Sequence, residues 1–472
     1  MSFKKVIMLI MCMKSALQRD LDRFYKEVSD SDFNIRAVTK GGFSSARKKL
    51  NPWAFQRLNE VAVNSFYEEA DYYVWGGHRL LSVDGSRLVL PNHHTVKEEF
   101  GEHSFGPKAD SKRSLAICSM LYDVFNHVTL DAQLAPYTDS EQSLLLQHLD
   151  KTQAGDLLLL DRGYPSFWLL FLLKARGLEF CVRLKEDWWL CVRDFTDSDS
   201  FEKEVIFTLP KKDFKRLADY PHCTQTTITC RLIKVILEDG TKEILCTSLL
   251  DTKEYPYEEF AELYHYRWSE EEAYKLLKSR AEVEAFSGKT AISVKQDFFA
   301  KVFLMSLCAI YAFPIEEKVR EEYKASEKRK YDQQINHTHA LAMTQDILVG
   351  VFLKHRFTKA IHAFDTLVAK TREIIRPGRN VARNKKPKKP YSMNYKRLWK
   401  LVSKPDDIQR GDTSLLNLMK TSYKQTKKDK KGWKSQKSND EQSGGLISYY
   451  LCRKTNMDKN LQYKELRLIK RH

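Results

Sequence analysis

The sequence predicts a mixed α/β fold with helical regions at both ends, and three observations lead to that prediction. The 472 residues are 42% hydrophobic and 12% aromatic, enough for a sizeable core in more than one domain. Strand-like runs begin at Leu80, and helical periodicity returns from Tyr257. Strands that alternate with helices are typical of an α/β core.

Residues 1–75 are expected to form a helical N-terminal region. The apolar run that begins at Val6 reaches Lys14 after only eight residues, so a buried helix is favoured over a signal peptide. Helical periodicity then continues and is interrupted at Gly41-Gly42. The helices would carry the exposed basic residues Arg47, Lys48, Lys49 and Arg57. DNA contact and plain packing both remain open for this region.

Residues 76–187 are expected to form the first part of the core. The strand-like runs are Leu80 to Val83, Arg87 to Leu90, Leu115 to Tyr122, Val128 to Ala135, Asp156 to Leu160 and Glu179 to Arg183. Helices are predicted over Ser140 to Leu149 and Pro165 to Arg176, the second with a proline in its first turn.

A β-rich insertion is expected over residues 188–250, and the last part of the core over 251–325, which is helical from Tyr257 to Arg320. The insertion would hold the strands Val205 to Leu209, Thr226 to Leu237 and Glu243 to Leu249. Residues 326–407 are expected to form a helical and basic region, in which Ala340 to Ile374 would be helical and Arg376 to Lys400 holds ten Lys or Arg and no acid. Residues 408–472 are expected to be a basic flexible tail.

Charge and cysteine content restrict the class of protein. The net charge of +17 favours a polyanionic partner, although charge alone does not separate DNA, RNA and lipid. No apolar run is expected to reach the ~20 residues that span a bilayer, so no membrane partner is predicted. The nine cysteines include no C-x2-C pair, which fits reduced thiols in a cytoplasm. His93-His94 and His337-Thr338-His339 lack zinc-finger spacing, which favours ordinary surface or packing roles.

The segment from Tyr264 to Lys278 carries the strongest candidate site. Tyr264, Arg267, Glu271 and Lys278 follow the spacing Y-x2-R-x3-E-x6-K. On one helix with Arg267 at zero, Glu271 would lie near ~40°, Lys278 near ~20° and Tyr264 near ~60°. Such a face suits a metal-bound phosphate, because the carboxylate can bind Mg²⁺ and the arginine can grip phosphate oxygens. A solvated helix with an Arg267–Glu271 ion pair is the alternative.

Two aspartates complete a candidate metal site. Asp84 ends an apolar strand before Gly85, and Asp161 follows the leucine run Leu157 to Leu160. A hairpin turn at Asp84 and an Asp161 that reaches solvent or pairs with Arg162 are the alternatives. Three acids from distant segments suit phosphoryl transfer, because two divalent ions can stabilise both the attacking and the leaving oxygen.

At these residues the sequence resembles the DDE transposases of bacterial insertion sequences, specifically insertion-sequence family four. The Y-x2-R-x3-E-x6-K signature is present without a substitution, and the resemblance spans roughly residues 40 to 400. It also covers Val83-Asp84-Gly85-Ser86, with Leu90-Pro91 downstream, and Leu160-Asp161-Arg162-Gly163-Tyr164. Residues after about Asp407 resemble nothing in that family.

The resemblance implies an RNase H-like catalytic core interrupted by a β-rich insertion. It implies that Asp84, Asp161 and Glu271 are catalytic and bind two Mg²⁺ ions, for which Mn²⁺ can substitute. Tyr264, Arg267 and Lys278 would bind the DNA backbone. Trp188 or Trp189 of the insertion would either stack a flipped base or serve in packing, and packing is favoured.

The implied activity is cut-and-paste DNA transposition. Water attacks a phosphodiester at the transposon end, and the freed 3′-hydroxyl attacks another phosphodiester. The expected partners are double-stranded DNA, as inverted-repeat ends and target, and a second copy of the chain in a homodimer. A bacterial cytoplasmic location at the nucleoid is implied. A catalytically inactive DNA-binding protein of the same fold and a nuclease without strand transfer are the alternatives.

Overall fold

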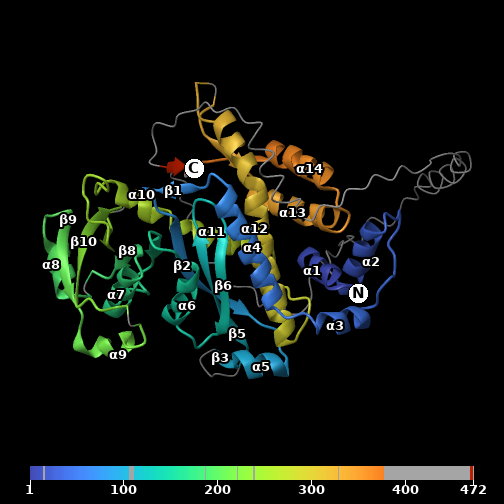
Figure 1. The fold of residues 1–472 in the computed structure, drawn as a ribbon, viewed down its shortest axis with the longest axis horizontal. Helices are drawn as coiled ribbons and strands as arrows, with labels where there is room; N and C mark the ends of the chain where they lie inside the picture. The colour runs from blue at the N-terminus through green and yellow to red at the C-terminus, as the bar shows by residue number, and fades with distance from the viewer. Residues whose placement is uncertain are drawn as a thin grey trace, which may run out of the picture.

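Figure 1 shows a central sheet between groups of helices. The computed structural model describes residues 1–13, 16–105, 111–186, 188–220, 222–237, 240–327, 329–376 and 468–470. The basic run that begins at Arg376 and almost all of the expected tail, 408–472, therefore lie outside the described residues.

The central sheet has eight strands in the order β6-β5-β2-β7-β8-β11-β10-β9. Their bounds are β2 (Leu80–Val89), β5 (Leu115–Asp123), β6 (Thr129–Pro136), β7 (Leu157–Leu160), β8 (Glu179–Leu184), β9 (Glu202–Thr208), β10 (Thr227–Ile236) and β11 (Lys242–Thr247). β7 is parallel to both β2 and β8, and every other neighbouring pair is antiparallel. The predicted mixed α/β fold is confirmed at this level.

The leucine run of β7 explains how the sheet is buried. All four residues are fully buried, and successive side chains of a strand point to opposite faces. Leu157 and Leu159 belong to one apolar cluster, with α11 and α12, and Leu158 and Leu160 belong to another, with α4 and α7. Both faces of the sheet are therefore covered, which explains why the run is continuously apolar.

Residues 188–250 extend this sheet rather than form a separate layer. β11 pairs with the core strand β8, with Ile244 opposite Leu184, and β10 and β9 follow outward. The three strands lie within a few residues of their predicted positions. The same segment also holds two short helices, α8 (Leu190–Asp197) and α9 (Phe214–Leu217), and the 3₁₀ turn η2 (Lys211–Asp213).

The long helix α12 (Ala291–Glu322) runs beside α4 (Trp53–Glu69) through the middle of the view in Figure 1, between the central sheet and the helices at the right. It is long and apolar enough to cross a membrane by length and composition, which the sequence expectation missed. However, 78% of its most apolar stretch is buried inside the protein. Its apolar side chains serve the core, since Phe298 and Leu304 are fully buried.

Two expectations for the N-terminal region are wrong. Gly41 and Gly42 do not break a helix but lie in the first turn of α3 (Lys40–Arg47), where the Thr39 hydroxyl accepts a hydrogen bond from Gly42 N at 3.2 Å. Arg47 is not exposed but buried, because its guanidinium pairs with Asp297 of α12 at 2.6 Å. The other helices here are α1 (Phe3–Cys12) and α2 (Leu17–Val28).

The stretch predicted to be helical, Tyr257 to Arg320, holds three helices: α10 (Glu259–His265), α11 (Trp268–Ser279) and α12. The stretch predicted to be helical from Ala340 to Ile374 holds α13 (His337–Phe352) and α14 (Phe357–Lys370), but its last residues form the strand β13 instead. The remaining elements are β1 (Tyr73–Trp75), α5 (His94–Phe100), β3 (His103–Phe105), β4 (Ser111–Arg113), α6 (Glu141–His148), η1 (Leu149–Lys151), α7 (Phe167–Ala175), β12 (Gln333–Ile335), β13 (Arg372–Ile374) and β14 (Leu468–Lys470). Three two-stranded sheets pair β1 with β14, β3 with β4, and β12 with β13.

Candidate active site

Asp84 lies in the middle of a strand and not at its end. The runs predicted as two strands are one strand, β2, which continues to Val89 because β5 pairs along its whole length, with Asp84 opposite Met120. The hairpin-turn alternative for Asp84-Gly85 is therefore wrong. The Asp84 side chain is 24% exposed, and its Oδ1 accepts a hydrogen bond from Gly85 N at 2.8 Å.

The parallel pairing of β2 with β7 brings Asp161 next to Asp84. Val83 lies opposite Leu160 at the end of β7, so the residue that follows each of them is an aspartate. Asp161 begins a turn in which its carbonyl oxygen accepts a hydrogen bond from Tyr164 N at 3.0 Å. Because the two strands are parallel neighbours in this register, two acids far apart in sequence lie side by side.

The four residues of the signature do not lie on one continuous helix. Tyr264 belongs to α10, Glu271 and Lys278 belong to α11, and Arg267 is the residue before α11 begins. The Tyr264 ring is only 4% exposed, and its hydroxyl donates to the carbonyl oxygen of Leu160 at 3.4 Å. In this conformation Tyr264 supports the end of the strand that precedes Asp161.

Arg267 lies between two of the predicted catalytic acids. Its guanidinium is 3.3 Å from Glu271 Oε1 and 3.9 Å from Asp84 Oδ2. The side chain is 6% exposed, and its Nε is buried without a hydrogen-bond partner among the described residues. A buried donor of this kind costs free energy unless something binds it, so the site has an unused hydrogen bond for an anionic group.

Lys278 joins α11 to the strand that carries Asp84. Its Nζ donates to Ser86 Oγ at 2.6 Å and to the carbonyl oxygen of Arg87 at 2.7 Å. Lys278 thus contacts β2 directly, and the charge of Glu271 on the same helix acts on Asp84 of that strand. In this conformation the ammonium group is bound within the protein, so the DNA-binding role of Lys278 stays a prediction.

Glu270, which the sequence analysis did not single out, fixes α11 on β2. It is fully buried, accepts a hydrogen bond from Asp84 N at 2.9 Å, and accepts another from the Ser82 hydroxyl. Burial raises the pKa of Glu270 well above its ordinary value, and the charge of Asp84 raises it further. Only the run of three glutamates, Glu270 to Glu272, could have indicated it from sequence.

Glu141, the first residue of α6, is a fourth acid at the site that sequence reasoning missed. A Cβ atom on Gly85 would lie 2.6 Å from Glu141 Oε1, and one on Gly163 would lie 3.4 Å from Oε2. Gly85 and Gly163 thus leave room for the Glu141 carboxylate, because neither has a side chain. Burial raises the pKa of Glu141, and the charges of Asp84 and Asp161 raise it further.

The charges at the site favour a bound cation. Burial raises the pKa of Asp84, and the nearby charges of Asp161 and Glu271 add to this effect, against the lowering by Gly85 N–H and Arg267. The carboxylates of Asp84, Asp161 and Glu271 thus lie near one buried guanidinium, and Glu141 lies near the two aspartates. Oxygen ligands without histidine or cysteine are the set that Mg²⁺ prefers, so these residues fit a hard divalent cation.

A basic hollow lies beside Asp161. It is lined by Arg162, Arg183, Leu184, Lys185, Glu186 and Lys242. Next to it, Trp188 is 39% exposed and stacks on Trp189, with ring centroids 5.4 Å apart, and Trp189 stacks on Phe167. Cationic side chains beside an exposed aromatic ring can contact both the phosphates and the bases of a nucleic acid.

Residues 75–308, which include all four acids, match the family described as the transposase DDE domain. The chain carries a transposase DDE domain. The resemblance to DDE transposases of insertion sequences is thereby confirmed, although the four-residue signature itself is not tested by this match.

Two curated relatives are transposases of Escherichia coli strain K12. The transposase InsG for insertion sequence element IS4 is 24% identical over 245 residues, which is 51% of this chain and 53% of the relative. The putative transposase InsZ is 22% identical over 153 residues, 32% of this chain and 50% of the relative. The chain thus spans about half the length of the curated relatives it matches.

Among solved structures, this chain is similar to the piggyBac transposase in a synaptic complex with hairpin DNA. The sequence identity is 10%, and the match covers 78% of this chain and 75% of the other. The TM-score is 0.37, so the likeness carries no conclusion about detail.

Proposed function

We propose that this protein is a DNA transposase of the DDE type, which cuts phosphodiester bonds at the ends of an insertion sequence and joins them to target DNA. The single observation that carries the proposal is the gathering of Asp84, Asp161 and Glu271 around Arg267 within the DDE domain. The strand order β6-β5-β2-β7-β8, antiparallel and then parallel, supports an RNase H-like core, and β11-β10-β9 would be its insertion.

Asp84, Asp161 and Glu271 are the proposed ligands of two Mg²⁺ ions, and Glu141 is proposed as a further acid near the first two. When bound, the ions would act as Lewis acids on the phosphodiester and lower the pKa of an attacking water. Mn²⁺ has the same preference for oxygen ligands and is expected to substitute.

The chain's own residues would hold the DNA. Arg267 has an unpartnered Nε and would bind an oxygen of the reacting phosphate in place of part of its contact with the two acids. Tyr264 would position the end of β7, and Lys278 would position β2. They would contact the DNA only if α10 or α11 moves. The basic hollow at Arg162 would take the adjoining DNA backbone, with Trp188 as a surface for a base.

Double-stranded transposon ends and target DNA are the proposed partners, within a homodimer at the bacterial nucleoid. The proposed cut-and-paste route has two steps at one site. Water first hydrolyses a phosphodiester, and the freed 3′-hydroxyl then attacks a second phosphodiester by transesterification. The net charge of +17 supports a polyanionic partner.

The test is a nicking assay on DNA from both flanks of the protein's own gene. With Mg²⁺ or Mn²⁺ we expect end-specific nicks, which Asp84→Asn, Asp161→Asn and Glu271→Gln each reduce by at least about 10³-fold while DNA binding survives. Glu272→Gln is the matched control, because Glu272 lies on the same helix with its side chain 70% exposed. Full cleavage by all three variants would refute the proposal.

A target plasmid separates the alternatives. A transposase gives joined products, a nuclease of the same fold gives nicks without joined products, and an inactive DNA-binding protein gives end-specific binding without either. The presence of all three acids argues against the inactive protein.

A further inference from the structure

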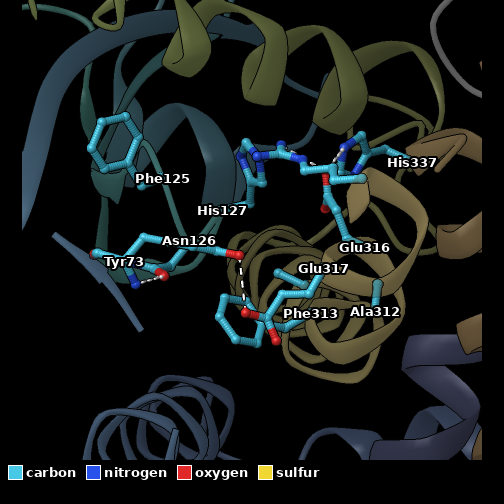
Figure 2. Close-up of a pocket in the computed structure, with 11 residues that line it drawn as sticks. Tyr73, Phe125, Asn126, His127, Ala312, Phe313, Glu316, Glu317 and His337 are labelled. Atoms are coloured by element: carbon cyan, nitrogen blue, oxygen red, sulfur yellow. Dashed lines mark hydrogen bonds and ion pairs between the residues drawn. The ribbon is translucent and has the colours of Figure 1, made fainter. Parts of the chain in front are cut away.

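A second group of possible metal ligands lies outside the acidic site. It consists of His127, Glu316 and His337, and one ligand atom from each lies within 4.8 Å of the others. The three come from different parts of the chain: the turn between β5 and β6, helix α12, and the first residue of α13. Figure 2 shows the two imidazole rings pointing toward each other, with the Glu316 carboxylate near both.

The backbone and a neighbouring tyrosine orient His127. Its φ is 57°, in the left-handed region that side chains other than glycine rarely adopt, and such positions often mark function. Nδ1 lies 3.0 Å from the Tyr122 hydroxyl. If Nδ1 carries the proton and donates it to Tyr122, then Nε2 is free as a ligand, which is how protein groups usually orient a metal-binding histidine.

His337 is placed by the start of α13. Asn336 caps that helix, its side chain accepting a hydrogen bond from His339 N at 2.9 Å. The Nε2 atom of His337 lies 3.6 Å from Glu316 Oε1, and the two histidine rings are 5.1 Å apart at their centroids. Ala312 and Phe313 of the surrounding pocket lower the local dielectric, which strengthens the attraction between Glu316 and a cation bound to it.

Glu316 has two cationic partners without a metal, His337 when it is protonated and Arg320. Arg320, one turn further along α12, donates from Nη2 to the same Oε1 atom at 2.8 Å. Its side chain is 42% exposed, so the guanidinium can rotate toward solvent. An ion at this position would replace Arg320 as the counter-charge of Glu316.

We propose that His127, Glu316 and His337 bind one Zn²⁺ ion, with water as the fourth ligand, and that the ion ties the β5–β6 turn to α12 and α13. Two imidazoles and one carboxylate are a donor set that suits Zn²⁺ better than Mg²⁺. Tetrahedral bonds of about 2.1 Å place ligand atoms roughly 3.4 Å apart. The present separations therefore need only small side-chain rotations.

The ion would also brace the DDE domain. Phe125 of the same turn packs edge-on against Tyr266, with ring centroids 4.8 Å apart. Tyr266 directly precedes Arg267 at the junction of α10 and α11. A metal ion that stiffens the turn would therefore stabilise the α10–α11 junction, from which Arg267 contacts Asp84 and Glu271.

The test measures zinc directly on the full chain, with excess Mg²⁺ present to saturate the acidic site. We expect one equivalent of zinc by mass spectrometry and a Co²⁺ absorption spectrum typical of tetrahedral nitrogen and oxygen ligands. His127→Gln and His337→Gln should lose both signals, and His362→Gln, an exposed histidine of α14, should keep them. Arg320→Gln should bind about tenfold more tightly, because a competing cation is removed.

Tighter binding by Arg320→Gln guards against a variant that merely unfolds, since misfolding does not increase specific affinity. The proposal is overturned if the unaltered chain takes up no zinc, or if zinc and the Co²⁺ spectrum persist in His337→Gln. Either result would contradict the zinc site without changing the outcome of the nicking assay. A failure of this inference can therefore be told apart from a failure of the proposed function.

Discussion

At the scale of the residue, the site is a balance between four acids and one buried guanidinium. Arg267 contacts Asp84 and Glu271, while Asp161 and Glu141 act on Asp84 and on each other through their charges. A protein that lacks one of these acids should still fold, because its removal relieves electrostatic repulsion between the carboxylates. The proposed metal-binding role of these acids therefore comes at some cost to stability.

Glu141→Gln tests the acid that the sequence did not reveal. The amide keeps the side-chain shape but removes one negative charge, so we expect the Mg²⁺ or Mn²⁺ concentration for half-maximal nicking to rise about 10- to 100-fold. Metal titrations of nicking rate measure this, and tryptophan fluorescence titrations with Mn²⁺ give a readout without catalysis. An unchanged metal dependence would remove Glu141 from the site.

At the scale of the element, the side chains of Glu270, Tyr274 and Lys278 dock α11 on β2. Glu270 accepts hydrogen bonds from Ser82 and from Asp84 N, Tyr274 donates to the carbonyl oxygen of Asp84 at 2.8 Å, and Lys278 contacts Ser86 and Arg87 at the far end. The position of Glu271 relative to Asp84 thus depends on a helix-to-strand contact, more than on either element alone.

Glu270 should make stability depend on pH. Its pKa in the folded protein lies well above the ordinary value of 4.5, so the folded state holds the proton more tightly than the unfolded state does. The stability that the protonated Glu270 carboxyl contributes is fully present below about pH 4.5, and it is lost as the pH rises toward the folded-state pKa. Glu270→Gln cannot ionise, so its melting temperature relative to the unaltered protein should rise between about pH 5 and pH 8.

Thermal unfolding followed by circular dichroism across this pH range measures the difference. Glu272→Gln is the control, because its exposed side chain should shift the melting temperature by the same small amount at every pH. A difference for Glu270→Gln that does not change with pH would show that Glu270 is ionised in the folded protein.

At the scale of the whole molecule, α12 connects the N-terminal helices to the core. Arg47 donates to Asp297 and to the carbonyl oxygen of Ser293 on α12, and to the side chains of Gln296 and Ser287. This ion pair is almost fully buried, with side chains 6% and 8% exposed. Breaking a buried pair is costly, because the partner is left as an uncompensated charge.

Arg47→Met should lower the free energy of unfolding by about 3–5 kcal/mol. Arg57→Met is the matched control, since Arg57 pairs with Glu60 but has a side chain 53% exposed, and it should cost less than about 1 kcal/mol. Urea unfolding measures both changes. Equal effects of the two substitutions would contradict the structural role of Arg47.

The sequence by itself determined most strands of the central sheet, the mixed α/β fold and the resemblance to DDE transposases, from which the three catalytic acids are proposed. These features are local: a strand's burial pattern is set by its own alternation, and a motif is a fixed spacing along one segment. Only the tertiary structure decided that Asp84 lies inside β2, that Arg47 is buried, and that Glu141, Glu270 and the group of His127 lie where they do. Each depends on partners far away in sequence, and the energy of a charge is set by those partners and by burial, which no local pattern records.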